Sequence, residues 1–274
     1  MLRLVVVESN TAATSSKILA RGAIPLGPQF AAALAEIDPA LSIDIVRPYE
    51  GETAPLEGAD GIVFTGSGED WSTDDPRAAP LIRVMEAAFN KGVPAYGSCN
   101  GLNLAAVVLG GAVGHAPNGY ELGLARDVQL TSAGRAHPMM AGRSAAFAVP
   151  CIHRDEVTRL PEGAVLLASN PHTTVQAMAY DHGGVSFWGT QYHPEYRPSD
   201  VAQTMMARGL GEDASNNDLD LAETNDAAAG RWGTTRAELA PARRMTELRN
   251  WLTHIDRIRA GRPSCFGWRA PELR

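Results

Sequence analysis

Residues 93–111, VPAYGSCNGLNLAAVVLGG, join two apolar runs through Gly97-Ser98-Cys99-Asn100-Gly101. The first run, 93–98, has the composition of a buried strand, whereas the second, 101–111, has helical spacing and ends in Gly-Gly. A sharp strand–turn–helix connection lifts one side chain clear of the backbone, and flanking glycines relieve the crowding of such a turn. The stretch therefore predicts a raised cysteine at the carboxyl end of a strand.

The pattern Gly97-x-Cys99-x-Gly101 is the cysteine counterpart of a nucleophile elbow. A helix that begins directly after Cys99 directs free N–H groups and a partial positive charge at the sulfur, and both favour thiolate over thiol. The backbone amide of Asn100 would then lie near a developing oxyanion. The alternative interpretation is a small buried cysteine in a tight turn, because free cysteine often packs as a hydrophobe.

The residues before the elbow predict a parallel sheet. Apolar, β-branched runs that resemble buried strands alternate with segments of helical spacing, which places a parallel sheet between two layers of helices. The expected strands are 2–8, 42–48, 61–65 and 93–98, and the expected helices are 28–38, 79–92 and 101–111.

After residue 120 the pattern changes to short apolar runs with little helix between them, which predicts further strands, some of them antiparallel. These runs are 125–131, 145–150, 163–169, 173–180 and 184–193. We therefore expect an α/β fold with a mixed, mostly parallel central sheet flanked by helices. The site should lie at the carboxyl ends of the strands.

We expect one domain over residues 1–200 and a helical C-terminal extension over 201–274 that packs on the core. Three further segments, one in the first domain and two in the extension, are interpreted separately. Residues 9–27 resemble a loop with at most one helical turn, the acidic stretch 214–230 resembles a mobile loop, and 236–261 resembles one amphipathic helix.

The composition excludes several classes of function. The 274 residues carry a net charge of −7, which argues against nucleic acid as a partner. No apolar run approaches the roughly 20 residues that span a bilayer, and no signal-peptide pattern precedes the first strand. The three cysteines, Cys99, Cys151 and Cys265, are too few for a disulfide framework and have no zinc-site spacing. We expect a cytoplasmic protein without a metal site, in which Cys151 and Cys265 are inert.

A thiol nucleophile needs a base, and the base usually needs a group that orients it. His193 ends the apolar run 184–193, and Glu195 follows two residues later. The carboxyl ends of parallel strands meet at one edge of the sheet, so His193 would reach Cys99 there and Glu195 would hold its other nitrogen.

The pairing of GSCNGLNLAAVVLGG with GTQYHPE resembles the class I glutamine amidotransferases, which combine a Gly-x-Cys-x-Gly elbow with a later His-Pro-Glu. DGIVFTGSGED (60–70) resembles the family's segment that supplies an oxyanion-hole amide. CIHRDEVTRLPEGAVLLASNPHTTVQAMAY (151–180) resembles its segment with His-x-Asp, here His153 and Asp155. The likeness covers roughly residues 1–200 and is nearest to the amidotransferase domain of GMP synthase, within a flavodoxin-like fold.

The resemblance implies that Cys99 attacks the amide carbon of glutamine or a related γ-glutamyl amide. It implies that His193 takes the thiol proton and passes one to the leaving amine, and that Glu195 orients His193. The backbone amides of Ser67 and Asn100 would hold the oxyanion, and Gly66 and Asn103 would contact the substrate. No cofactor is expected for this half-reaction.

Two departures from the family pattern leave the substrate open. Asn103 stands where many members have glutamine, and Gly66-Ser67-Gly68 replaces a Gly-Gly-Pro turn. The segment 9–27 is also longer than expected after the first strand.

Three functions therefore remain. The first is a glutaminase that supplies ammonia to a separate synthetase, because the sequence has no Gly-x-x-x-x-Gly-Lys-[Ser/Thr] phosphate loop of its own. The second is a stand-alone hydrolase of γ-glutamyl amines, and the third a non-enzymatic binding or redox-sensing member of the fold. The sequence leaves a homo-oligomer open.

Overall fold

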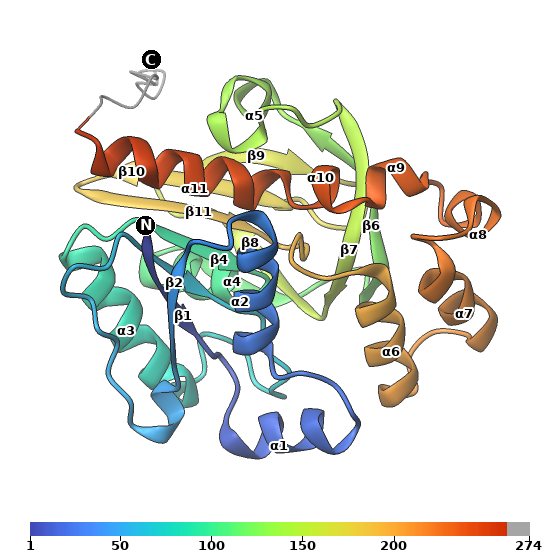
Figure 1. The fold of residues 1–274 in the computed structure, drawn as a ribbon, viewed down its shortest axis with the longest axis horizontal. Coiled ribbons are helices and arrows are strands. Elements are labelled where there is room, and N and C mark those ends of the chain that lie inside the picture. Colours follow the sequence, from blue (N-terminus) through green and yellow to red (C-terminus); the bar gives the residue numbers. More distant parts are fainter. Residues whose placement is uncertain (262–274) are drawn as a thin grey trace.

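The computed structural model describes residues 1–261, and its centre is a mixed sheet covered by helices (Figure 1). Within these residues the sheet has nine strands in the order β2-β1-β3-β4-β11-β10-β9-β6-β7. The strands are β1 Arg3–Val7, β2 Ser42–Val46, β3 Gly61–Phe64, β4 Ala95–Ser98, β6 Glu121–Leu130, β7 Ala146–His153, β9 Val165–Ser169, β10 Ala177–His182 and β11 Val185–Thr190. The α/β prediction is confirmed.

Strands β2, β1, β3, β4 and β11 run parallel, and β10, β9, β6 and β7 continue the sheet in antiparallel pairs. A separate antiparallel pair, β5 (Ala112–His115) with β8 (Asp155–Arg159), was not expected from the sequence. Parallel pairing of β3 with β4 and of β4 with β11 brings the carboxyl ends of these three strands to one edge.

Helices cover both faces of the sheet. They are α1 Ala12–Ala20, α2 Leu26–Ile37, α3 Ala79–Asn90, α4 Asn100–Val108, α5 Ser132–Ala136, α6 Pro198–Arg208, α7 Asp213–Leu221, α8 Asp226–Arg231, α9 Arg236–Leu239, α10 Pro241–Arg244 and α11 Thr246–Arg259. Helices α2 and α11 pack on one face through residues such as Phe30 and Trp251, whereas α3 and α4 pack on the other through Met85 and Leu102. Because apolar layers enclose both faces, β1 reads as a continuous apolar run.

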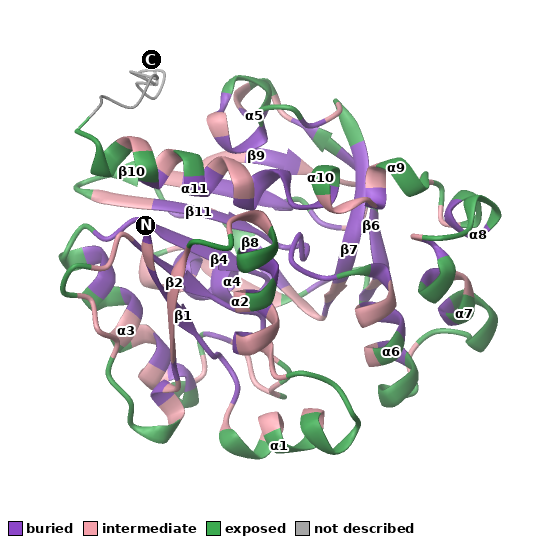
Figure 2. Cartoon of the chain, in the orientation of Figure 1, coloured by how far each residue is buried: buried purple, intermediate pink, exposed green. Residues whose placement is uncertain are grey.

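The segment 9–27 contains a nine-residue helix, so the prediction of a loop there is wrong. Thr11 caps α1 by accepting a hydrogen bond from the backbone N–H of Thr14. None of the residues of α1 is buried, and Figure 2 shows the helix on the outside of the molecule. A helix without a buried face leaves no apolar period in the sequence, which is why the pattern missed it.

The acidic stretch 214–230 is also helical, in α7 and α8, instead of a loop. These helices pack with α6 and α9 in a small apolar cluster against β6 and β7, to which Leu219 and Ala229 contribute. The stretch 236–261 is three helices rather than one, because Pro241 begins a new helix after α9.

Helix α6 spans residue 200, and α11 shares the main core with β1 and β11. The division of the chain at residue 200 stays a prediction. Among the described helices, none has both the length and the apolar content required to cross a membrane. Cys265 lies outside the described residues.

Candidate active site

Cys99 occupies the sharp turn between β4 and α4. Its backbone has φ 50° and ψ −101°, a conformation that a non-glycine residue rarely adopts. The flanking glycines permit this turn, because a Cβ on Gly97 would lie 2.5 Å from the carbonyl carbon of Gly101, and a Cβ on Gly101 would meet the carbonyl oxygen of Phe64. The turn therefore depends on both glycines and presents the sulfur beyond the end of β4.

His193 and Glu195 lie in the segment between β11 and α6 and meet Cys99 across the strand ends. His193 Nδ1 donates to Glu195 Oε1 at 2.7 Å, and its ring stacks on Tyr196 with the centroids 4.2 Å apart. The Cys99 sulfur lies close enough to His193 to contribute to the rise in its pKa, and Cys99 Sγ is 3.9 Å from the carbonyl oxygen of Ile152 on β7. The structure thus brings together the three residues that the sequence singled out.

The electrostatics of this group favour a protonated imidazole. Burial opposes the charge on His193, but the adjacent Glu195 carboxylate and the hydrogen bonds with Cys99 and Glu195 outweigh it and raise the pKa of His193 to about 10. A pKa in this range favours the imidazolium at neutral pH, a form that is able to donate a proton and to stabilise a thiolate beside it. That His193 takes the proton of the Cys99 thiol stays a prediction.

Ser98 also belongs to the group formed by Cys99, His193 and Glu195, and it was not predicted from the sequence. Its hydroxyl is fully buried, lies 2.9 and 3.0 Å from the two oxygens of Glu195, and is 3.3 Å from His193 Nδ1. The available sequence signal was a hydroxyl directly before the candidate nucleophile at the end of an apolar strand.

The Gly66-Ser67-Gly68 turn follows β3 and packs directly against His193. A Cβ on Gly66 would lie 2.8 Å from His193 Cε1. The turn is tied to the segment after β1, because the Gly68 N–H donates to Asn10 Oδ1 at 2.7 Å and the Ser67 hydroxyl donates to the Ser9 carbonyl at 3.2 Å. The longer segment after the first strand therefore helps to shape the site.

Two backbone N–H groups beside Cys99 are candidates for binding an oxyanion. Asn100 is the first residue of α4, where an N–H has no partner within the helix. Neither the N–H of Asn100 nor that of Ser67 donates to another backbone group within residues 1–261. Asn103 lies one turn further along α4, where its Nδ2 donates to the Asp155 carbonyl at 3.5 Å and its buried Oδ1 has no partner among the described residues.

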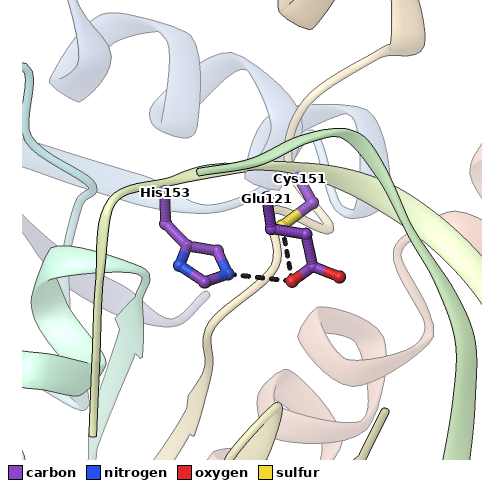
Figure 3. A group of neighbouring side chains, drawn as sticks. All are labelled: Glu121, Cys151 and His153. Atoms are coloured by element: carbon purple, nitrogen blue, oxygen red, sulfur yellow. Dashed lines mark hydrogen bonds and ion pairs between the residues drawn. The ribbon is translucent and has the colours of Figure 1, made fainter. Parts of the chain in front are cut away.

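Glu121, Cys151 and His153 form a second buried group on β6 and β7 (Figure 3). Their ligating atoms all lie within 4.8 Å of one another, a spacing that could hold a metal ion. Hydrogen bonds already satisfy the carboxylate, however. His153 Nε2 donates to it at 2.9 Å, and the Asn170 and Gln176 amides donate at 2.6 and 2.7 Å.

The pKa shifts in this group follow from burial and the same hydrogen bonds. Burial raises the pKa of Glu121, but the hydrogen bonds from His153, Asn170 and Gln176 hold it below its usual range. Burial and the Glu121 carboxylate raise the pKa of the Cys151 thiol well above its ordinary value. His153 therefore braces the β6–β7 pair, and Cys151 is a buried neutral thiol.

The family profile described as "Glutamine amidotransferase class-I" matches residues 30–212, more than half of the chain. The chain belongs to the class I glutamine amidotransferase family. It is 34% identical to a gamma-glutamyl-L-1-hydroxyisopropylamide hydrolase of Pseudomonas sp, over 97% of both chains. It is also 34% identical to a glutamine-hydrolyzing GMP synthase of Thiobacillus denitrificans, but over only 56% of this chain and 28% of that protein.

The fold agrees with this family assignment. A crystal structure of a glutamine amido transferase from Methylobacillus Flagellatus superposes with a TM-score of 0.62 at 20% identity. The match covers 98% of this chain and 100% of that one, so the likeness in fold extends to the helices after residue 200.

Proposed function

We propose that this chain hydrolyses a γ-glutamyl amide through a thioester on Cys99. The observation that carries the proposal is the buried Cys99–His193–Glu195 group on a strained elbow of a class I amidotransferase chain. The same geometry argues against a non-enzymatic member of the fold, for which neither the strain at Cys99 nor the buried charge pair has a use.

The geometry suggests the following order of events. The Cys99 thiolate attacks the γ-carbonyl carbon, and the N–H groups of Ser67 and Asn100 receive the negative oxygen. The His193 imidazolium then gives its proton to the nitrogen as the C–N bond breaks, so a neutral amine leaves and a γ-glutamyl thioester remains. Neutral His193 next takes a proton from water, which attacks the thioester and releases glutamate and the thiolate. Glu195 stays ionised and orients His193 throughout.

Two features support a leaving amine larger than ammonia. The match to the Pseudomonas hydrolase covers nearly all of both chains, whereas only about a quarter of the GMP synthase is matched. The second feature is Asn103, which is one methylene shorter than the glutamine common in the family and keeps a free buried carbonyl oxygen. We therefore favour a γ-glutamyl derivative of a small amine as substrate, hydrolysed by the chain alone, with Gly66 and Asn103 lining the pocket.

Glutamine is the second candidate substrate, because GMP synthase relatives share the amidotransferase part of this chain. In that case the ammonia would pass to a separate synthetase. Such a partner, like a homo-oligomer, stays a prediction.

Glutamate release by the purified chain distinguishes the two substrates. Glutamine and a panel of γ-glutamyl amines of increasing size serve as substrates, with Cys99→Ala as the blank and Cys151→Ala as the matched control for loss of a buried thiol. Rapid turnover of one γ-glutamyl amine and poor use of glutamine supports the stand-alone hydrolase, and weak turnover of glutamine alone supports the amidotransferase. Activity that persists in Cys99→Ala contradicts both.

A further inference from the structure

Two residues near the C-terminal end of the described chain hold the backbone on either side of His193. The Tyr192 hydroxyl donates to Glu247 Oε1 of α11 at 2.8 Å. Arg244 Nη1, from α10, donates to the carbonyl oxygen of Pro194 at 2.8 Å. Tyr192, Arg244 and Glu247 are all at most 1% exposed. His193 thus lies between two residues that α10 and α11 fix directly.

We infer that Arg244 and Glu247 are positioning residues, which hold the 192–195 segment so that His193 faces Cys99 and Glu195. The inference rests on the function proposed above, because it assigns these residues a part in that reaction. It also gives the helices after residue 200 a role in the site, beyond packing on the core.

The hydrogen bonds around Glu247 fix the positions of the groups that they join. Arg143, from the segment between β6 and β7, makes a bidentate pair with Glu247 at 2.7 Å to each oxygen, and its Nη2 also donates to the Arg244 carbonyl at 2.8 Å. Both side chains of this pair are at most 1% exposed. Burying an ion pair costs desolvation that its attraction often fails to recover, and apolar residues of similar volume commonly give equal or greater stability. Hydrogen bonds of fixed direction supply what apolar packing lacks, namely a defined position for Tyr192 and Pro194.

The segment that carries His193 needs such support, because it lies between β11 and α6 outside any regular element. The backbone N–H of His193 donates to the Pro150 carbonyl at 2.8 Å, and the Tyr192 carbonyl accepts from the Thr190 hydroxyl at 2.9 Å. These bonds secure the segment to the sheet on one side, and α10 and α11 secure it on the other. Small displacements of a catalytic group have large effects on rate, about 100-fold for roughly 1 Å.

Figure 1 shows α11 lying along the sheet beside β11, which carries the chain into the 192–195 segment. His254 of α11 stacks on Trp188 of β11 with the ring centroids 4.5 Å apart. Helix α11 is therefore fixed relative to β11, so that Glu247 holds the segment after β11 in a defined position.

Two matched pairs of substitutions test this inference. Arg244→Lys is compared with Arg243→Lys, because Arg243 is exposed and also donates to a backbone carbonyl, that of Gly142, which is not part of the 192–195 segment. Tyr192→Phe is compared with Tyr180→Phe, because Tyr180 is a half-buried phenol on β10 whose hydroxyl makes no hydrogen bond to Glu247 or to the 192–195 segment within residues 1–261.

The readouts are kcat and KM, the rate at which iodoacetamide alkylates Cys99 at pH 7 without substrate, and the midpoint of urea unfolding. We expect Arg244→Lys and Tyr192→Phe to lower kcat and the alkylation rate by about tenfold or more with KM within about twofold, whereas both controls keep wild-type kinetics. The unfolding midpoint should fall more for Tyr192→Phe than for Tyr180→Phe, because the Tyr192 hydroxyl donates to a buried carboxylate, so kcat and the alkylation rate are the deciding readouts.

Loss of stability in Arg244→Lys and Tyr192→Phe with unchanged kcat and alkylation would overturn the positioning role. If the wild-type chain cleaves no γ-glutamyl amide, the proposed function fails on its own. The alkylation rates then still decide whether Arg244 and Tyr192 control the approach of His193 to Cys99.

Discussion

In the proposed mechanism, the residues around Cys99 make its thiol reactive. The strained elbow places Cys99 beside His193, and Glu195 keeps His193 charged although the imidazole is almost fully buried. Without the carboxylate, burial alone would favour the neutral ring. In the proposed mechanism, His193 thus carries the proton that the leaving amine needs before the substrate binds.

Glu195→Gln tests this arrangement through pH dependence. Protonated His193 is the proposed acid, so kcat/KM of the wild-type chain should fall as the pH rises through about 10. Without the negative charge, burial lowers the pKa of His193, and the alkaline fall should move to lower pH while kcat drops about 10²–10⁴-fold. An alkaline limb that does not move in the pH profile of Glu195→Gln would show that Glu195 does not control the charge on His193.

Ser98→Ala removes the hydroxyl that lies within 3.0 Å of both oxygens of Glu195. We expect a loss of about 1–3 kcal/mol in the free energy of unfolding, because a buried carboxylate loses a donor. The fall in kcat should be smaller than for Glu195→Gln, because the charge remains. Urea unfolding and steady-state kinetics measure both effects, and Ser186→Ala, which removes a hydroxyl bonded to His254, is the matched control. Equal kcat values for the two serine variants would contradict this role of Ser98.

At the scale of elements, the sequence correctly predicted the strands, helices and turn that have strong local patterns. The buried strands β1, β3, β4 and β11 and the amphipathic helix α3 have apolar periods, and the elbow has its two glycines. Helices α1 and α7 were missed because they bury few or no apolar side chains. The pairing of β5 with β8 depends on contacts between distant segments, which no local pattern reports.

The elbow between β4 and α4 makes its own prediction. Gly101→Ala places a methyl group against the backbone of Phe64, which cannot move without disturbing β3. We expect a loss of about 1–3 kcal/mol in unfolding free energy and a large fall in Cys99 alkylation, because the turn must shift. Gly230→Ala in α8 is the control, because nothing lies within 4 Å of the added Cβ. Its stability should stay unchanged or rise by up to about 1 kcal/mol. Similar urea midpoints for both variants would show that the close approach at Gly101 is not required.

At the scale of the whole molecule, the helices after β11 pack against the sheet and contact the segment that carries His193. The contacts that join Arg143, Tyr192 and Glu247 link three segments that are far apart in the sequence. No spacing rule predicts such a network. The sequence therefore predicted a helical extension that packs on the core, but it did not predict the contacts between this extension and the segment that carries His193.

Trp251→Ala tests how far the fold depends on α11. Trp251 is 1% exposed and packs against Tyr96 with the ring centroids 5.8 Å apart, so its removal should lower the free energy of unfolding by about 3–5 kcal/mol. Ile258→Ala on the exposed side of the same helix should cost only about 0.5 kcal/mol. Equal urea midpoints for these two variants would show that α11 is not part of the core.

The most direct test of the central claim is to trap the covalent intermediate. The chain is mixed with a rapidly hydrolysed γ-glutamyl amide and quenched in acid during steady-state turnover, and its peptides are then analysed by mass spectrometry. We predict a peptide containing Cys99 that has gained the mass of one γ-glutamyl group, and no such gain in Cys99→Ala. Turnover without a labelled Cys99, or the same mass on another residue, would contradict the proposed mechanism.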